Sequence, residues 1–167
     1  SIIGNYEKSA DMFRSLAEKH PDMKDEFLFQ AACNESRYNS EIASETFKKV
    51  IELKGNHASL AAYNLVTLSF QNKDYSLVIE NIQNAQKSVP KDSLPMFNFI
   101  LGKSYYCLDK FDSAIPYFND FLKTQSKPDE YAKNAILIQL MCAQKTNNET
   151  VYAHTFEKLT QLFPNDP

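Results

Sequence analysis

The fold is decided by the stretch between residues 101 and 118, which reads LGKSYYCLDKFDSAIPYF. Apolar and small residues recur in it at the spacing of one helix face, first over 101–105 and again over 111–118. Gly102 has no Cβ, so a neighbouring helix can approach it closely. Asp109 lies before the second segment, where its carboxylate can cap a helix N-terminus. The stretch therefore predicts two helices joined by a short turn.

The second half of this stretch recurs along the whole chain. Large apolar residues stand at successive intervals of 34, 35, 36 and 38 positions, at Phe13, Phe47, Ile82, Phe118 and Phe156. The residue three positions after each of them is also apolar, as one face of a helix requires. In four of the five copies the residue eight positions after is a proline or glycine, which ends a helix. A fixed period of this length indicates an array of helical hairpins.

The pattern predicts an all-α fold of about nine helices. Five helices carry the large apolar residue, over about 5–19, 39–54, 74–88, 110–124 and 149–162. Four others precede them, over about 23–36, 58–71, 94–107 and 129–145. We expect a single repeat domain over 1–167, composed of a half-repeat 1–22 and repeats at about 23–57, 58–92, 93–128 and 129–167.

Composition argues against several classes of function. The net charge is −3, whereas proteins that bind nucleic acid usually carry a basic excess. The longest apolar stretch, 135–143, is too short to cross a bilayer, so no direct membrane insertion is expected. Three glycines cannot form a phosphate-binding loop, and the three cysteines and three histidines form no ligand motif. We therefore predict no catalytic residues, no metal and no cofactor, and a protein that is not an enzyme.

The repeat resembles the tetratricopeptide repeat family. The best match is Leu101-Gly102-x-x-Tyr105 followed by Phe111-x-x-Ala114-x-x-x-Phe118, and Pro90 and Pro164 match the closing proline of the family. The first and fourth copies depart from the pattern. The resemblance implies a right-handed α-solenoid of helix-turn-helix repeats, in which the first helix of each repeat lines a concave face that binds peptides.

Carried over position by position, the resemblance implies a set of groove residues on these first helices. The main set is Leu60, Tyr63, Thr67, Phe70, Met96, Phe99, Lys103, Tyr106 and Leu137. The divergent copies add Leu28, Ala32, Glu35, Asn134 and Met141. The aromatic members would form a binding strip, because aromatic side chains are enriched at interaction surfaces. The alternative is that these aromatic side chains pack in the core between helices.

These features predict a scaffold that binds a peptide or a partner protein. Binding of a chaperone C-terminal tail is disfavoured, because Lys103 is the one basic residue of the main groove set. The alternative is a structural spacer or self-association segment of a larger bacterial protein, such as one of the cell envelope. The first and last helices leave apolar faces uncovered, so we expect a parent protein that is longer at both ends, or a homo-oligomer formed through these helices. The identity of the partner and the compartment stay open.

Overall fold

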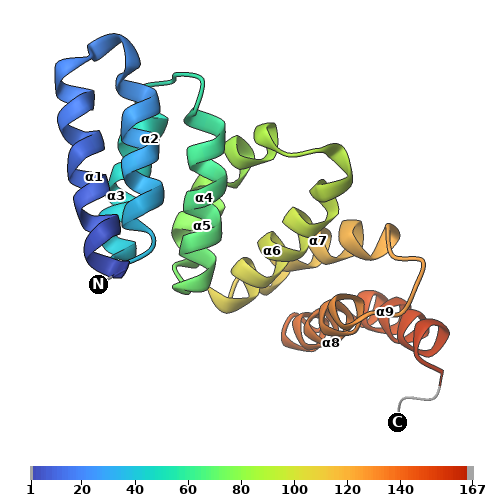
Figure 1. Ribbon diagram of the computed structural model, residues 1–167. Helices are drawn as coiled ribbons and strands as arrows, with labels where there is room; N and C mark the ends of the chain where they lie inside the picture. Colours follow the sequence, from blue (N-terminus) through green and yellow to red (C-terminus); the bar gives the residue numbers. More distant parts are fainter. Residues whose placement is uncertain (1, 165–167) are drawn as a thin grey trace. The chain divides into compact units, whose positions relative to one another are not determined.

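The computed structural model describes residues 2–164 (Figure 1). Within this range the chain is all-α and contains no strand, as predicted. Its nine α-helices are α1 (Ile2–Lys19), α2 (Lys24–Glu35), α3 (Ser40–Glu52), α4 (Ala58–Gln71), α5 (Tyr75–Ala85), α6 (Leu94–Cys107), α7 (Phe111–Lys123), α8 (Glu130–Lys145) and α9 (Glu149–Leu162). Each predicted helix is present, and most of the boundaries lie within two residues of the prediction. Helix α5 ends at Ala85 because its last predicted turn, Gln86–Ser88, is a 3-10 turn.

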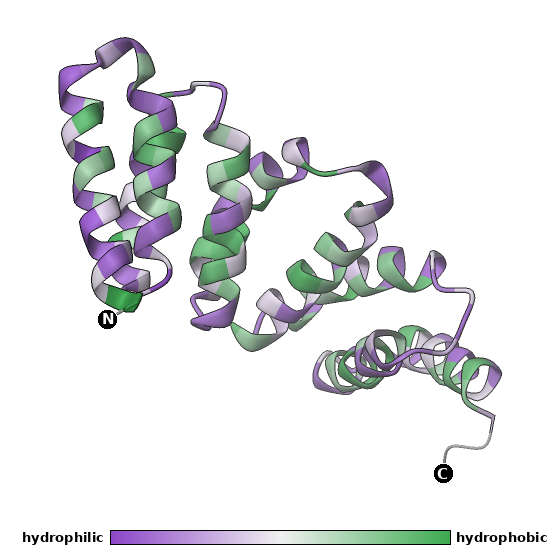
Figure 2. Ribbon diagram, in the orientation of Figure 1, coloured by the Kyte–Doolittle hydropathy of each residue, from purple (hydrophilic) through white to green (hydrophobic). Residues whose placement is uncertain are grey.

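The chain divides into two compact units, Ser1–Val89 and Pro90–Pro167. In unit 1, each helix from α1 to α5 packs against the next one in sequence. In unit 2, the helices α6 to α9 do the same, and α6 also contacts α8. Hydrophobic and hydrophilic residues alternate along the helices (Figure 2), as expected for helices that bury one face.

Three of the hairpins share the same turn. The residues Lys73, Asp109 and Asn147 each follow the first helix of a pair and have φ between 52° and 62°. The next N–H donates to the carbonyl five residues earlier, at 2.8 to 2.9 Å, in the pairs Asp74–Ser69, Lys110–Tyr105 and Asn148–Ala143. This is the Schellman arrangement, which satisfies the carbonyls at a helix C-terminus. The hairpin geometry therefore recurs at intervals of 36 and 38 residues.

The prediction that Asp109 caps α7 is wrong. Asp109 itself adopts the left-handed conformation of the turn, with a φ of 57°. The N-cap position of α7 is occupied by Lys110, which makes no side-chain cap hydrogen bond. An aspartate suits both places, because its short polar side chain caps helices and also tolerates positive φ better than most residues do.

The large apolar residues of the central copies form the cores. Phe47 and Ile82 are buried in unit 1, and Phe118 is buried in unit 2. The close approach predicted at Gly102 is confirmed: a Cβ added there would lie 2.9 Å from the ring of Phe118. The ring of Phe118 thus fills the space that the missing side chain of Gly102 leaves open.

The fifth copy departs from this pattern. Phe156 is 49% exposed, and its neighbour Thr155 is buried instead, with its hydroxyl donating to the Val151 carbonyl at 2.7 Å. In unit 2, Phe118 belongs to a cluster that includes residues of the following helix α8. No helix follows α9 among residues 2–164, so Phe156 lacks the second packing partner that encloses Phe118.

Candidate functional site

The predicted groove residues lie on two surfaces, one in each unit. In unit 1, the first three of them are exposed along one face of α4: Leu60, Tyr63 and Thr67. Phe70, on the last turn of the same helix, is half-buried, and its ring packs edge-on against Tyr75 of α5 at 5.9 Å. Phe70 therefore contributes to packing within the α4–α5 hairpin, and the exposed part of this face is short.

In unit 2, helices α6 and α8 together form a broader surface. The Tyr106 hydroxyl of α6 lies 3.7 Å from the sulfur of Met141 on α8, so side chains of the two helices meet there. Leu137 is 45% exposed and Met141 is 44% exposed, and Tyr131 and Asn134 are exposed on the same face of α8. Lys103 and Met96 on α6 are half-buried beside them. We call this set the α6–α8 surface: Met96, Lys103, Tyr106, Tyr131, Asn134, Leu137 and Met141.

The prediction that Phe99 lines a groove is wrong. Phe99 is only 4% exposed. Its ring centroid lies 5.3 Å from that of Phe121, 6.3 Å from that of Phe118 and 5.4 Å from that of Tyr131. Phe99 is thus a core residue whose ring packs against Tyr131. Packing in the core is the alternative that the sequence had left open for the aromatic residues.

The predicted groove phase is also wrong in the first copy. Ala32 and Glu35 are fully buried, and Leu28 is half-buried. The exposed residues of α2 are instead Lys24 and Glu26, in its first turn. A shift of one or two positions turns a helix residue by 100° or 200°, so a small error in alignment exchanges the open face for the buried one.

The buried carboxylate of Glu35 forms an ion pair that the sequence did not indicate. Its side chain is fully buried in the last turn of α2, although the resemblance implied a residue of the open groove. The guanidinium of Arg14, on α1, contacts one carboxylate oxygen of Glu35. Arg14 also lies 3.4 Å from Asp11. Because anions are unfavourable at a helix C-terminus, the charge of Arg14 is the main compensation for Glu35.

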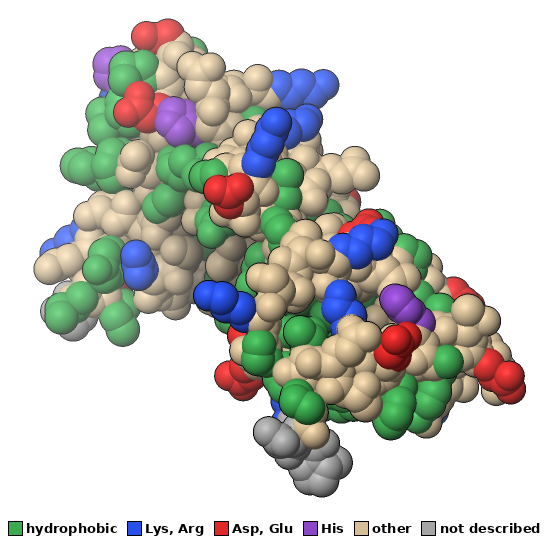
Figure 3. All heavy atoms as spheres, turned by 90° about the vertical axis from the view of Figure 1, so that its right-hand side faces the viewer, with side chains coloured by type: hydrophobic (Ala, Val, Ile, Leu, Met, Phe, Trp, Pro, Cys, Tyr) green, Lys and Arg blue, Asp and Glu red, His purple; other side chains and the backbone are tan. Residues whose placement is uncertain are grey.

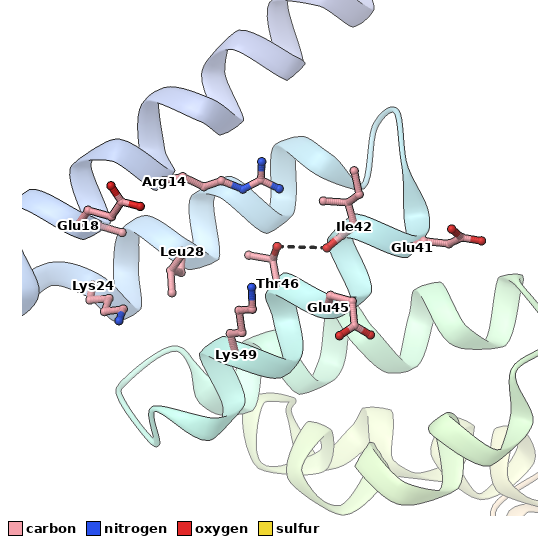
Figure 4. A pocket seen from close by; sticks show the side chains of 10 residues that line it. Arg14, Glu18, Lys24, Leu28, Glu41, Ile42, Glu45, Thr46 and Lys49 are labelled. Carbon is pink, nitrogen blue, oxygen red and sulfur yellow. Dashed lines mark hydrogen bonds between the residues drawn. The ribbon is translucent and has the colours of Figure 1, made fainter.

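A cavity of about 530 Å³ lies beside this ion pair, between α1, α2 and α3. Figure 4 shows Arg14 extending from α1 towards α3, where Ile42 and Thr46 lie. The rim of the cavity carries both positive and negative side chains: Arg14, Glu18, Lys24, Glu41, Glu45 and Lys49. Balanced charges of this kind favour no particular ligand, and Arg14 is already engaged by Glu35.

His57, in the loop between α3 and α4, contacts Asp25 of α2. Its ring Nδ1 lies 2.8 Å from Asp25 Oδ2, and its backbone N–H donates to the same oxygen at 3.0 Å. The imidazole also stacks on Phe29 at 5.1 Å. A Cβ at Gly55 would lie 2.5 Å from the Asp25 carboxyl carbon, so this loop needs glycine there. Asp25 and His57 are 32 positions apart, which explains why the sequence did not reveal this cluster.

Two of the three cysteine thiols have a raised pKa. Burial raises the pKa of Cys142 to about 11, and the charge of Asp112 adds to this effect. Burial also raises the pKa of Cys33. All three cysteines are free. Over residues 2–164, no group of three or more histidine, cysteine or acidic side chains is placed to hold a metal ion.

Charges of both signs are interspersed among hydrophobic side chains on the face shown in Figure 3. Among the described helices, none has both the length and the apolar character needed to span a bilayer. A scan against models of protein families finds none that matches the chain, and a search of curated proteins also returns no match.

Proposed function

We propose that this chain is a right-handed solenoid of tetratricopeptide type that binds a segment of a partner polypeptide on the α6–α8 surface. The observation that carries the proposal is the exposure of Tyr131, Leu137 and Met141 on one face of a well-packed unit. Aromatic residues and methionine are the side chains enriched at protein interfaces. The solenoid geometry itself is supported by the recurrent hairpin turns and by the period of the sequence.

The charges of α6 and α8 indicate the chemistry of the partner segment. The two helices carry three lysines, Lys103, Lys133 and Lys145, and one acidic residue, Glu130. They are therefore basic within a chain whose net charge is −3. Lys103 is the charged residue of the α6–α8 surface, so a segment that combines apolar side chains with a carboxylate complements it, because opposite charges improve both encounter and orientation.

The test is selection of 12-residue peptides from a random library on the purified chain, followed by anisotropy titrations. We expect the selected peptides to be rich in apolar and acidic residues. Leu137→Ser with Met141→Ser should weaken their binding at least about tenfold, since a buried apolar side chain contributes about 1.5–3 kcal/mol. Both side chains are already exposed, so the fold should persist.

The matched control is Met12→Ser with Leu53→Ser, which removes two equally exposed apolar side chains from unit 1. This variant should bind the selected peptides as the wild type does. If the control variant loses binding and the Leu137–Met141 variant keeps it, the partner binds elsewhere and the proposal is wrong.

Self-association is a second candidate function, favoured by a specific feature of α1. Ile2, Ile3 and Met12 are 75%, 59% and 53% exposed on this helix. Exposed apolar side chains of this kind promote association of chains. Light scattering over a concentration series would detect a dimer, and Ile3→Ser with Met12→Ser should abolish it. A strictly monomeric wild-type chain would remove this candidate.

A further inference from the structure

Three hairpins share the same turn, and in each of them one side chain of the first helix (α4, α6 or α8) occupies an equivalent position. The carbonyls that accept the turn hydrogen bond belong to Ser69, Tyr105 and Ala143. In unit 2, the ring of Tyr105 stacks on Tyr117 of α7, with centroids 5.4 Å apart and planes inclined by 7°. Where the residue is small, a cavity lies beside it: about 340 Å³ at Ala143 and about 720 Å³ at Ser69.

The larger cavity lies within unit 1, between α3 and the α4–α5 turn. Hydroxyl groups and carboxylates dominate its lining, from Ser40, Ser44, Ser69, Glu41, Glu45 and Asp74. Lys48 is the one basic residue of this lining, and its ammonium is engaged by Glu45 at 2.8 Å. One of the three carboxylates is thus neutralised, and the cavity retains an excess of negative charge.

Ser69 has an unsatisfied hydroxyl. The residue is 2% exposed, and its Oγ has no hydrogen-bond partner among the residues that the structure describes. Other hydroxyls on these helices donate to the carbonyl four residues earlier, as Ser44 does to Ser40 at 2.8 Å and Thr67 does to Tyr63 at 3.0 Å. A buried polar atom without a partner destabilises the fold, so a donor bound in the cavity would relieve this cost.

The electrostatics of Lys48 agree with an anionic cavity. The hydrogen bond that Lys48 donates to Glu45 raises the pKa of the ammonium, and the charges of Glu80 and Asp74 add to this effect. Asp74 accepts the N–H of Leu77 with one oxygen, at 3.2 Å, as the N-cap of α5. Its second oxygen can accept from a ligand, because a carboxylate has about four acceptor sites.

We propose that this cavity binds the guanidinium group of an arginine on a partner polypeptide. A guanidinium is always charged and presents five N–H donors in one plane, so it can reach several acceptors at once. The carboxylate of Glu41 and the Asp74 oxygen would take its charge, and the Ser69 hydroxyl would gain its missing hydrogen bond. The site lies in unit 1 and does not depend on the function proposed for the α6–α8 surface.

The test is a titration of the ¹⁵N-labelled full chain with N-acetyl-L-arginine amide. Binding is monitored through the amide chemical shifts of the chain. The control ligand is N-acetyl-L-citrulline amide, which has the same shape without the charge. We expect saturable shifts confined to 40–48 and 69–77, with a Kd on the order of 1 mM, for the arginine compound alone. Equal binding of the citrulline compound, or no saturable shift with arginine, would overturn the proposal.

Two variants test the lining. Glu41→Gln with Glu45→Gln removes two of the three negative charges with little change in volume and should weaken arginine binding at least about tenfold. Glu52→Gln, on the same helix but outside the cavity, should bind as the wild type does. Ser69→Tyr, which copies the residue at the equivalent position of α6, should abolish binding. Unaltered binding by the double glutamine variant contradicts the proposal even if Ser69→Tyr does not fold.

A blocked Ala-Arg-Ala tripeptide tests whether the arginine can belong to a polypeptide. Binding at least as tight as that of the single residue supports a polypeptide partner. Binding of the single residue with exclusion of the tripeptide would overturn this part of the proposal, since it would restrict the site to a free small molecule.

Discussion

At the scale of single residues, the burial of the Glu35 side chain depends on its partner, Arg14, more than on its residue type. It is fully buried, and the Arg14 charge compensates it across the contact between α1 and α2. A buried ion pair adds little net stability, but removal of one partner leaves an uncompensated charge. The pair therefore acts mainly as a constraint on how α1 packs against α2.

Arg14→Leu is expected to destabilise unit 1 by about 3 kcal/mol, because it leaves the Glu35 carboxylate buried without a countercharge. Urea denaturation followed by circular dichroism measures the change. A second substitution, Glu35→Leu, should restore most of the lost stability. Arg37→Leu, at an exposed position, is the control and should change stability by less than about 0.5 kcal/mol. Additive losses in the double variant would contradict this account of the pair.

Gly102→Ala is expected to destabilise unit 2 although alanine is the better helix former. The added methyl would lie 2.9 Å from the buried ring of Phe118. Overpacking costs about 1–3 kcal/mol, which exceeds the gain in helix propensity of about 1 kcal/mol over much of that range. Denaturant midpoints measure the balance.

A smaller residue at position 118 provides the check on this explanation. Phe118→Leu should make Gly102→Ala less costly than it is in the wild-type chain, because the two side chains share one space. A full loss of stability from Gly102→Ala in the Phe118→Leu background would show that the ring is not the cause.

Single-residue predictions from the sequence succeeded where a residue is enclosed by neighbours on all sides. Gly102 and Phe118 were placed correctly, because a small residue opposite a large one is a packing relation between the helices of one hairpin. Phe99, Glu35 and Phe156 were not. A rotation by one position turns a helix residue by 100° and reverses the exposure expected for it.

At the scale of helices, the recurrent turn is the feature that we did not predict from the sequence. Lys73, Asp109 and Asn147 share a positive φ, yet only the asparagine and the aspartate have a residue-level preference for it. The turn is imposed by the packing of the two helices that it joins. The existence of each helix was predictable from apolar periodicity, whereas the residue that adopts the left-handed conformation was not.

Pro116 is the second feature at this scale. It is exposed at the sixth position of α7, which continues through it. Because proline has no N–H, the carbonyl of Asp112 loses its helical hydrogen bond. Pro116→Ala should therefore raise the free energy of unfolding by about 1–2 kcal/mol, after allowance for the greater freedom of the unfolded chain.

Pro95 is a matched control for this prediction. It lies at the second position of α6, where an N–H would have no helical partner in any case. Pro95→Ala should bring no gain in thermal stability, whereas Pro116→Ala should raise Tm by several degrees. A lower Tm for Pro116→Ala would indicate that the proline has a packing role that outweighs the lost hydrogen bond.

At the scale of the whole molecule, the chain presents two units with different surfaces. Unit 1 holds the anionic cavity at Ser69, and unit 2 holds the exposed apolar side chains of α6 and α8. The all-α class and the helix order were predictable, because they follow from a period that the whole chain repeats. The surfaces were only partly predictable: Tyr106 and Leu137 were named, but Tyr131, which rests on Phe99, was not.

The most direct test of the binding proposal is an isotope-filtered NOE measurement on the complex with a selected peptide. The chain would carry ¹³C-labelled methyl groups on leucine and methionine. We expect NOEs from the peptide to the methyl groups of Leu137 and Met141. NOEs to Met12 or Leu53 in unit 1, with none to α8, would contradict it.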